Sequence, residues 1–482
     1  MALIGAFFVL ANLAIFSFPG AIFWDDWTLF GTPREDIVRH FTEAGLPHAG
    51  YINWALTLLG PGGVRVFVFV AGLVSVLLWF KILRITPNIS LSSLAVSVAL
   101  ATTFPFFLAR VAAINAISVM ALVIFLVGWL KFLQGTVSQD RKNSALGLVL
   151  VWFSGVLYSA YIPMLLLVAL HVALVLSWSL KKVPWKKLIY VTTVLFFAHG
   201  VVLLLQRQLY PPHGQYAGYR TILFGENQFI LFVAGVGALL AFIFLLFRRI
   251  NVRSTSAWRR SVEVAMLGLI GFLLAISPYI LKGSSFPPYS EWRSRYELNY
   301  FIPATLILLA IFVLLETKVS RKVLGALGAS VILASIVYSN YLLSRFYVDW
   351  QKHSYVTEVL SANRDVIAGK FVVFLDETWG LNAMGRGLRF YEWSGILSDA
   401  TGAQNTFGLS ARDFDSAFSS YLDGEQDRRL NLVYNYRWEN HKFPSDGVVV
   451  TIRTVGNSSC GLFNFSVRDC LSVDVKSESP SA

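Results

Sequence analysis

Two adjacent carboxylates stand where a long apolar stretch of the chain ends. Asp25 and Asp26 lie between aromatic residues in Phe23-Trp24-Asp25-Asp26-Trp27. One negative charge raises the pKa of its neighbour, and such a pair can act as general base or hold a divalent cation such as Mg²⁺ or Mn²⁺. The alternative is that one of them only caps the following helix, because residues 27–41 have amphipathic spacing.

A pair of arginines lies far along the chain, in residues 282–300. Arg293 and Arg295 are one residue apart, with Tyr296 beside them. Guanidinium groups form bidentate pairs with phosphate, so this spacing predicts a phosphate clamp. The alternative is that the arginines only extend to lipid headgroups.

Several other polar residues stand in segments that join apolar runs. They are Arg220 and His213 in a segment rich in Gly and Pro, His48 and Asn53 near the acidic pair, and Arg110 after Phe104-Pro105-Phe106. We expect Arg220 to help bind the phosphate, and the other four to contact a polar substrate. The sequence contains no Gly-rich phosphate loop and no cluster with metal-ligand spacing.

The composition requires lipid as the solvent for most of the chain. Of 482 residues, 56% are hydrophobic and 14% are charged, with a mean hydropathy of +0.60. Runs long enough to cross a bilayer recur eleven times. They lie at residues 2–22, 64–83, 91–109, 111–130, 145–159, 161–180, 188–205, 228–247, 262–281, 299–315 and 323–344.

The charges between these runs predict an orientation. Alternate loops, which begin after residues 83, 130, 180, 247 and 315, are strongly basic, whereas the opposite set is mixed and longer. Basic loops face the cytoplasm, so the N-terminus is predicted inside. The long loops at 19–63, 206–227 and 282–300 are then extracytoplasmic. Topology and anionic lipid explain the net charge of +12, and we expect no nucleic-acid partner.

The tail has a different composition, so we divide the chain into a membrane domain, 1–344, and an extracytoplasmic domain, 345–482. A helix is predicted at 356–368, and β-rich runs at 371–375, 432–436, 448–455 and 462–467. Cys460 and Cys470 allow at most one disulfide. The predicted fold is an α-helical polytopic membrane protein with about eleven spans and a small α/β domain.

This arrangement resembles the GT-C superfamily of membrane glycosyltransferases. The shared features are the acidic pair Asp25-Asp26 after the first helix, a long first outside loop, the late outside arginines Arg293 and Arg295, and an appended outside domain. In outline it is most similar to bacterial serotype-converting glucosyltransferases that modify O-antigen. The resemblance covers the architecture of the whole chain but depends on short motifs.

The resemblance implies transfer of a sugar from a polyprenyl-phosphate donor to a glycan or lipid-linked acceptor at the outer face of the cytoplasmic membrane. Arg293 and Arg295 would stabilise the leaving phosphate, and Asp25 or Asp26 would accept the proton of the acceptor hydroxyl or hold a divalent cation. Two alternatives remain open here. One is a transporter or flippase for a lipid-linked sugar, and the other is a surface-polysaccharide polymerase or ligase.

Overall fold

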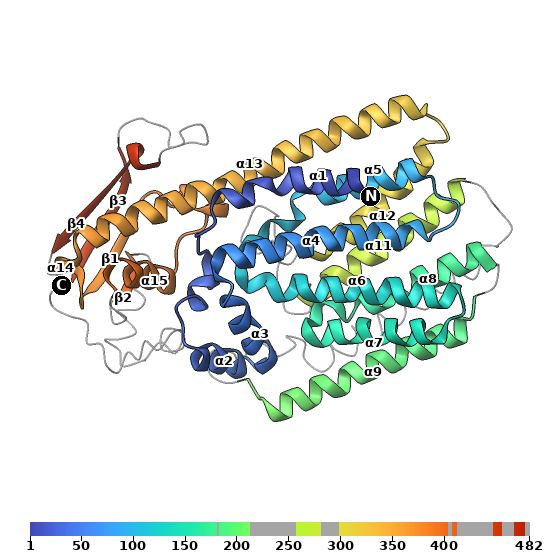
Figure 1. Cartoon of the computed structure of the whole chain (residues 1–482), viewed down its shortest axis with the longest axis horizontal. Helices are drawn as coiled ribbons and strands as arrows, with labels where there is room; N and C mark the ends of the chain where they lie inside the picture. Colours follow the sequence, from blue (N-terminus) through green and yellow to red (C-terminus); the bar gives the residue numbers. More distant parts are fainter. Residues whose placement is uncertain are drawn as a thin grey trace.

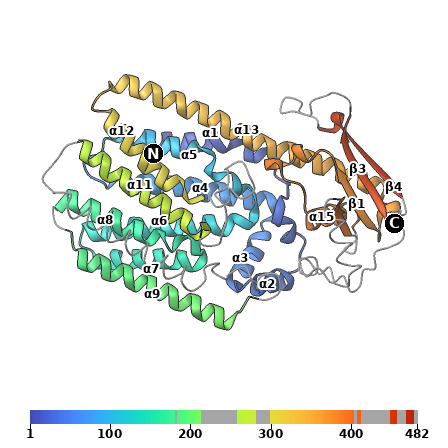
Figure 2. The ribbon, with the colours of Figure 1, turned by 180° about the vertical axis from the view of Figure 1, so that it is seen from behind.

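Long helices lie side by side and form a bundle that makes up most of the molecule (Figures 1 and 2). The computed structural model describes residues 1–180, 183–212, 257–280, 298–402, 407–411, 447–455 and 467–477. The bundle contains α1 (Ala2–Asn12), α4 (Gly60–Arg84), α5 (Leu91–Thr103), α6 (Ala116–Val137), α7 (Arg141–Leu157), α8 (Met164–Leu180), α9 (Trp185–Leu209), α11 (Ala257–Ile280), α12 (Phe301–Leu315) and part of α13 (Arg321–Ala362). A helix satisfies its own backbone groups, as lipid requires.

Several of these helices are long and apolar enough to cross a membrane. Six described helical stretches meet that criterion, and those at residues 2–17, 91–103 and 301–315 are apolar but shorter. The predicted multi-pass helical architecture is therefore confirmed in its coarse form. The expected span at 228–247 lies outside the described residues, so the count of eleven stays a prediction.

Polar residues start three helices at the same end of the bundle. The Ser90 hydroxyl accepts the backbone N–H of Ser93 at the start of α5, and Asp140 accepts those of Lys142 and Asn143 at the start of α7. Ser320 caps α13 in the same way. These side chains satisfy donors that no helical carbonyl can reach, and they fix where each helix begins.

Glycines allow α6 and α7 to approach closely. A Cβ on Gly147 would collide with the backbone nitrogen of Phe132, and one on Gly135 would collide with that of Ser144. Close backbone approach through small residues is a common way for helices to associate in lipid, where apolar burial offers little advantage. The pair thus packs as expected for membrane helices.

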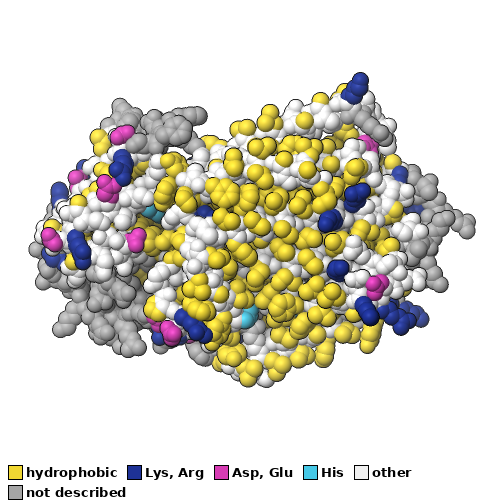
Figure 3. Space-filling model, viewed as in Figure 1, with side chains coloured by type: hydrophobic (Ala, Val, Ile, Leu, Met, Phe, Trp, Pro, Cys, Tyr) yellow, Lys and Arg dark blue, Asp and Glu magenta, His cyan; other side chains and the backbone are white. Residues whose placement is uncertain are grey.

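The surface of the bundle is divided into an apolar band and charged ends. Figure 3 shows hydrophobic side chains across the middle, with lysines and arginines at the end remote from the C-terminal sheet. Exposed apolar residues of this band include Val70 on α4, Leu204 on α9 and Leu333 on α13. A continuous apolar band between polar ends is the surface that a lipid-embedded protein presents.

Two short helices lie at the other end of the bundle, beside the C-terminal domain (Figure 1). They are α2 (Arg34–Glu43) and α3 (Pro47–Thr57), and Gly50 of α3 touches the backbone of Val38 in α2. The helix expected from residue 27 begins only at Arg34. Extended Pro33 precedes it as N-cap, so neither Asp25 nor Asp26 caps this helix and that alternative is wrong.

Helix α13 joins the bundle to the C-terminal domain without a break. It runs over 42 residues from Arg321 to Ala362, and α14 (Arg364–Ile367) follows it. The boundary proposed between residues 344 and 345 therefore falls inside one helix. The predicted helix at 356–368 is divided between the end of α13 and α14.

The C-terminal domain contains a four-stranded sheet in the order β2-β1-β3-β4. β1 (Phe371–Asp376) is parallel to β2 (Phe407–Ser410) and β3 (Val448–Thr454), and β4 (Leu471–Ser477) is antiparallel to β3. The strands predicted at 371–375 and 448–455 are confirmed. The run at 432–436 lies outside the described residues, as does 462–467 except for its last residue.

Helix α15 (Phe390–Thr401) connects β1 to β2 and covers the sheet. Trp393 of α15 stacks on Phe374 of β1 with ring centroids 4.0 Å apart, and Val356 and Leu360 of α13 join the same core. Cys470, directly before β4, is disulfide-bonded, and Cys460 is the other cysteine of the sequence. The α/β character predicted for the tail is confirmed.

Candidate functional site

The acidic pair lies on a short 3-10 helix, η2 (Trp24–Thr28), at the junction of the bundle and the C-terminal domain. Trp24 has φ +54, a left-handed conformation that costs a bulky residue about 1–2 kcal/mol. Phe346 of α13 packs against the Trp24 ring, with ring centroids 5.6 Å apart. Tertiary packing therefore maintains a strained turn directly before Asp25.

Asp26 points into the protein and caps a distant helix. Its Oδ2 accepts the backbone N–H of Ala113 at 2.7 Å, and its Oδ1 accepts that of Ile114 at 2.9 Å. These donors begin the apolar helical stretch Ala113–Val137, where the helix dipole also favours a negative charge. Asp26 is 1% exposed, and burial raises its pKa to about 7 against the opposing effect of these two hydrogen bonds.

Arg65 fixes the backbone that leads to the acidic pair. Its guanidinium donates to the carbonyl oxygens of Pro19 and Ala21 and lies against the rings of Phe18 and Phe23. Arg65 also lowers the pKa of Asp26, in opposition to burial. The turn before η2 is thus tied to the start of α4.

Asp25 points the other way, toward the C-terminal domain. The hydroxyl of Tyr391 on α15 donates to Asp25 Oδ1 at 2.7 Å. Arg386 in turn donates to the Tyr391 hydroxyl at 3.1 Å and to Glu392 Oε1 at 2.8 Å. The carboxylate of Asp25 is half-buried and oriented by a side chain 366 positions later in the chain.

The charges around Asp25 are unevenly distributed. Burial acts against the charge of Arg386, but Glu392, Tyr391 and Asp25 together raise its pKa above the ordinary value. Burial lowers the pKa of His40, on α2, to about 4, although Asp25 acts in the opposite direction. At neutral pH the surroundings of Asp25 therefore include a cationic arginine and a neutral histidine.

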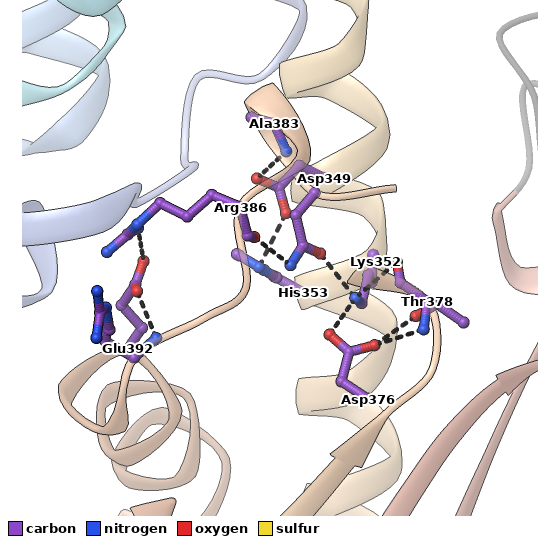
Figure 4. A network of polar contacts seen from close by, with 10 residues as sticks. Asp349, Lys352, His353, Asp376, Thr378, Ala383, Arg386 and Glu392 are labelled. Carbon is purple, nitrogen blue, oxygen red and sulfur yellow. Dashed lines mark hydrogen bonds and ion pairs between the residues drawn. The ribbon is translucent and has the colours of Figure 1, made fainter. Parts of the chain in front are cut away.

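A larger polar network extends from Arg386 into the C-terminal domain (Figure 4). The Arg386 carbonyl accepts from Asn382, whose Oδ1 accepts from Lys352 at 2.7 Å. Lys352 is 0% exposed and also donates to Asp376 Oδ2 at 2.7 Å. Because Lys352 lies on α13, this network fixes the segment before α15 to the helix that enters the bundle.

Three other predicted site residues, His48, Asn53 and Arg110, are among the described residues. His48 is half-buried on α3, and Asn53 is 1% exposed on the same helix. Neither polar atom of the Asn53 amide finds a partner among the described residues, so a polar ligand or water is needed to satisfy it. Arg110 is buried in the bundle against Gly72 of α4.

The predicted phosphate ligands cannot be placed. Arg220, His213, Arg293, Arg295 and Tyr296 all lie outside the described residues. Their roles therefore stay predictions.

The two carboxylates are poorly arranged to share a cation. Both oxygens of Asp26 already accept backbone N–H groups inside the protein, whereas Asp25 is directed toward Tyr391. Within the described ranges, no group of three His, Cys, Asp or Glu side chains could hold a metal ion. The described residues do not fit the expected divalent cation, and we derive no step through it.

Several residues around Asp25 were not predicted from the sequence. Tyr391, Arg386 and Glu392 come from the C-terminal domain, and His40 comes from α2. Glu392 was a usable signal for the start of α15, because at the third helical position its side chain accepts the backbone N–H of Arg389. Nothing in the sequence indicated that α15 meets Asp25.

The fold and the residues around the acidic pair define a class of protein. It is a mostly helical chain with several apolar helices able to span a membrane, a small C-terminal sheet, and an acidic turn between the two. No family model matches the chain, and no curated protein sequence matches it either.

Proposed function

We propose that the protein transfers a sugar from a polyprenyl-phosphate donor to a glycan or lipid-linked acceptor at the outer face of the cytoplasmic membrane. The observation that supports this proposal most strongly is Asp25, a half-buried carboxylate where the bundle meets a polar domain. A lipid-borne donor and the polar sugar of an acceptor have to meet at such a boundary.

Asp25 is the proposed general base. In the transfer, the acceptor oxygen bonds to the anomeric carbon, and the bond from that carbon to the phosphate oxygen breaks. The acceptor proton goes to Asp25, and the lipid phosphate leaves with the electron pair. Tyr391 orients the carboxylate through its 2.7 Å hydrogen bond, and Asp26 supports the turn as a helix cap.

The leaving phosphate needs positive charge more than it needs a proton. Arg293 and Arg295, with Tyr296 and Arg220, remain the proposed ligands of that phosphate. The C-terminal domain would then present the acceptor to Asp25, because Tyr391 of α15 already touches that carboxylate.

The charge distribution supports the proposed orientation. Lysines and arginines gather at the bundle end remote from the sheet (Figure 3), which by the positive-inside rule is cytoplasmic. The disulfide-bonded Cys470 also fits an oxidising compartment for the C-terminal domain. The N-terminus would be cytoplasmic and the acidic turn extracytoplasmic.

The test is sugar addition to surface polysaccharide, measured by mass spectrometry in cells that express wild type, Asp25→Asn or Tyr391→Phe at matched membrane levels. Loss of the general base should reduce addition by about 100-fold or more in Asp25→Asn. Tyr391→Phe should show a smaller loss, because the base remains but is less well oriented.

The controls separate the two parts of the proposal. No sugar addition by wild type relative to cells without the protein would overturn the transferase. Full addition by Asp25→Asn would overturn the assignment of the base. Equal thermal stability of wild type and Asp25→Asn in detergent shows that a loss of addition is chemical.

A further inference from the structure

A cavity of about 240 Å³ lies where α13 leaves the bundle. Its walls come from the bundle, from α13 and from the segment before α15. They are Leu108, Leu342, Arg345, Phe346, Met384 and Gly385. The cavity thus touches both the membrane part and the C-terminal domain.

Arg345 is the charged residue of this cavity. Its guanidinium donates one hydrogen bond to the carbonyl oxygen of Gly380 at 2.7 Å, and it forms no ion pair within the described ranges of the chain. The other walls are apolar side chains and Gly385. A guanidinium without a carboxylate partner, beside apolar walls, favours an anionic ligand with an apolar part.

The position along α13 places the cavity at the edge of the apolar band. Leu333, Val337 and Tyr341 are exposed on this helix, and the rings of Tyr338 and Tyr341 stack with centroids 6.3 Å apart. Tyrosines collect at the boundary between lipid and water. Arg345 follows one helical turn later, at the depth of lipid headgroups.

The wall on the side of the C-terminal domain is held in a fixed shape. Met384 and Gly385 have φ values of +58 and +61, and Asp349 of α13 accepts the backbone N–H of the preceding Ala383 at 2.9 Å. A non-glycine residue such as Met384 persists in this left-handed conformation only where surrounding contacts maintain it. The cavity is therefore a formed site and not a gap that side chains could close freely.

We infer that this cavity binds a lipid with a phosphate headgroup. The phosphate would accept hydrogen bonds from Arg345, and the adjoining hydrocarbon would lie against Leu342 and Met384. The volume admits the part of a lipid next to its headgroup, with the rest of the chain along the exposed face of α13. The inference stands on the lining of this cavity and does not depend on the proposed transfer reaction.

Two lipid sources share this chemistry, an anionic phospholipid of the membrane and a lipid-linked phosphate. Phe346, which lines the cavity, also packs on Trp24 and on Phe23. A lipid in the cavity would contact the ring that holds the strained turn before Asp25, so it would also stabilise that turn.

Native mass spectrometry of the purified protein in detergent tests the inference with matched lipid pairs. Phosphatidylglycerol is compared with diacylglycerol, which lacks the phosphate, and farnesyl phosphate with farnesol. Wild type should retain the anionic member of at least one pair about tenfold better than Arg345→Gln does, the loss expected for a charge-assisted hydrogen bond. Preference within the first pair identifies a phospholipid source, and preference within the second a lipid-linked phosphate.

Two further variants check the location. Leu342→Trp fills the cavity and should lose the anionic lipid although Arg345 is present, whereas Arg364→Gln, on exposed α14, should retain it. Thermal unfolding confirms that each variant is folded. Equal retention by wild type and Arg345→Gln in both pairs, or full retention by Leu342→Trp, would overturn the inference. Either result is independent of whether the protein transfers a sugar.

Discussion

Asp25 and Asp26 are neighbours in the chain but have different roles in the structure. Trp24, at φ +54, turns the chain so that Asp26 meets the first N–H groups of a buried helix and Asp25 meets Tyr391. A side chain whose oxygens are held by backbone donors stabilises the fold. A half-buried carboxylate with a hydroxyl partner can exchange that partner for a substrate hydroxyl.

At this scale we expect Asp26→Asn to destabilise the protein more than Asp25→Asn does. The introduced side-chain amide would direct its own N–H group at one of the two backbone donors, leaving that donor unsatisfied, which costs about 1–3 kcal/mol. Thermal unfolding in detergent measures the difference. A lower Tm for Asp25→Asn than for Asp26→Asn would contradict the division of roles.

The pH dependence of Tm in wild type and Asp26→Asn gives a second check on the role of Asp26. Burial raises the pKa of Asp26 from 3.8 to about 7, so between these values the folded protein holds a proton that the unfolded chain releases. The raised pKa of Asp26 stabilises the folded protein fully below pH 3.8, and this stabilisation is lost as the pH rises through 7. Wild type should therefore lose more Tm than Asp26→Asn does between about pH 5 and pH 8.

At the scale of elements, α15 positions Tyr391 by packing on η2. A Cβ added to Gly395 of α15 would collide with the ring of Trp27, so this close contact requires glycine. The adjoining residues Trp393 and Ile396 are buried in the core of the C-terminal domain. The helix therefore has little freedom to move away from the sheet.

Gly395→Ala should displace α15 from η2 and destabilise the protein by about 1–3 kcal/mol, the usual cost of inserting an atom into a packed contact. Gly387→Ala is the matched control, because nothing lies within 4 Å of a Cβ at that position. The readout is thermal unfolding together with sugar addition. An unchanged Tm in Gly395→Ala would show that η2 and α15 are not packed together.

The elements that could be predicted from the sequence are those with a strong local pattern. Apolar runs predicted the bundle helices, and β-rich runs predicted β1 and β3. The contacts of Asp26 with Ala113 and of Asp25 with Tyr391 span 87 and 366 positions and leave no local pattern. The expected division at residue 345 falls inside α13, because this helix runs from the bundle into the C-terminal domain without a break.

At the scale of the whole molecule, α13 is one continuous helix that connects the bundle to the sheet. Its first part packs in the bundle, and its last turns join the core beneath β1 and β3. Lys352 lies between these parts and is fully buried, with Asp376 of β1 and Asn382 as partners (Figure 4). The orientation of the sheet relative to the bundle depends on this buried cation.

Lys352→Met should release the C-terminal domain while the bundle stays folded. The change leaves the Asp376 carboxylate, whose side chain is 9% exposed, without its cation, and breaking a buried pair on one side typically costs about 3–5 kcal/mol. Limited proteolysis should cut the domain faster, and helical circular dichroism should change little. Lys476→Met, at an exposed position on β4, serves as the control. Loss of the helical signal together with the domain would instead mean that the two parts unfold as one cooperative unit.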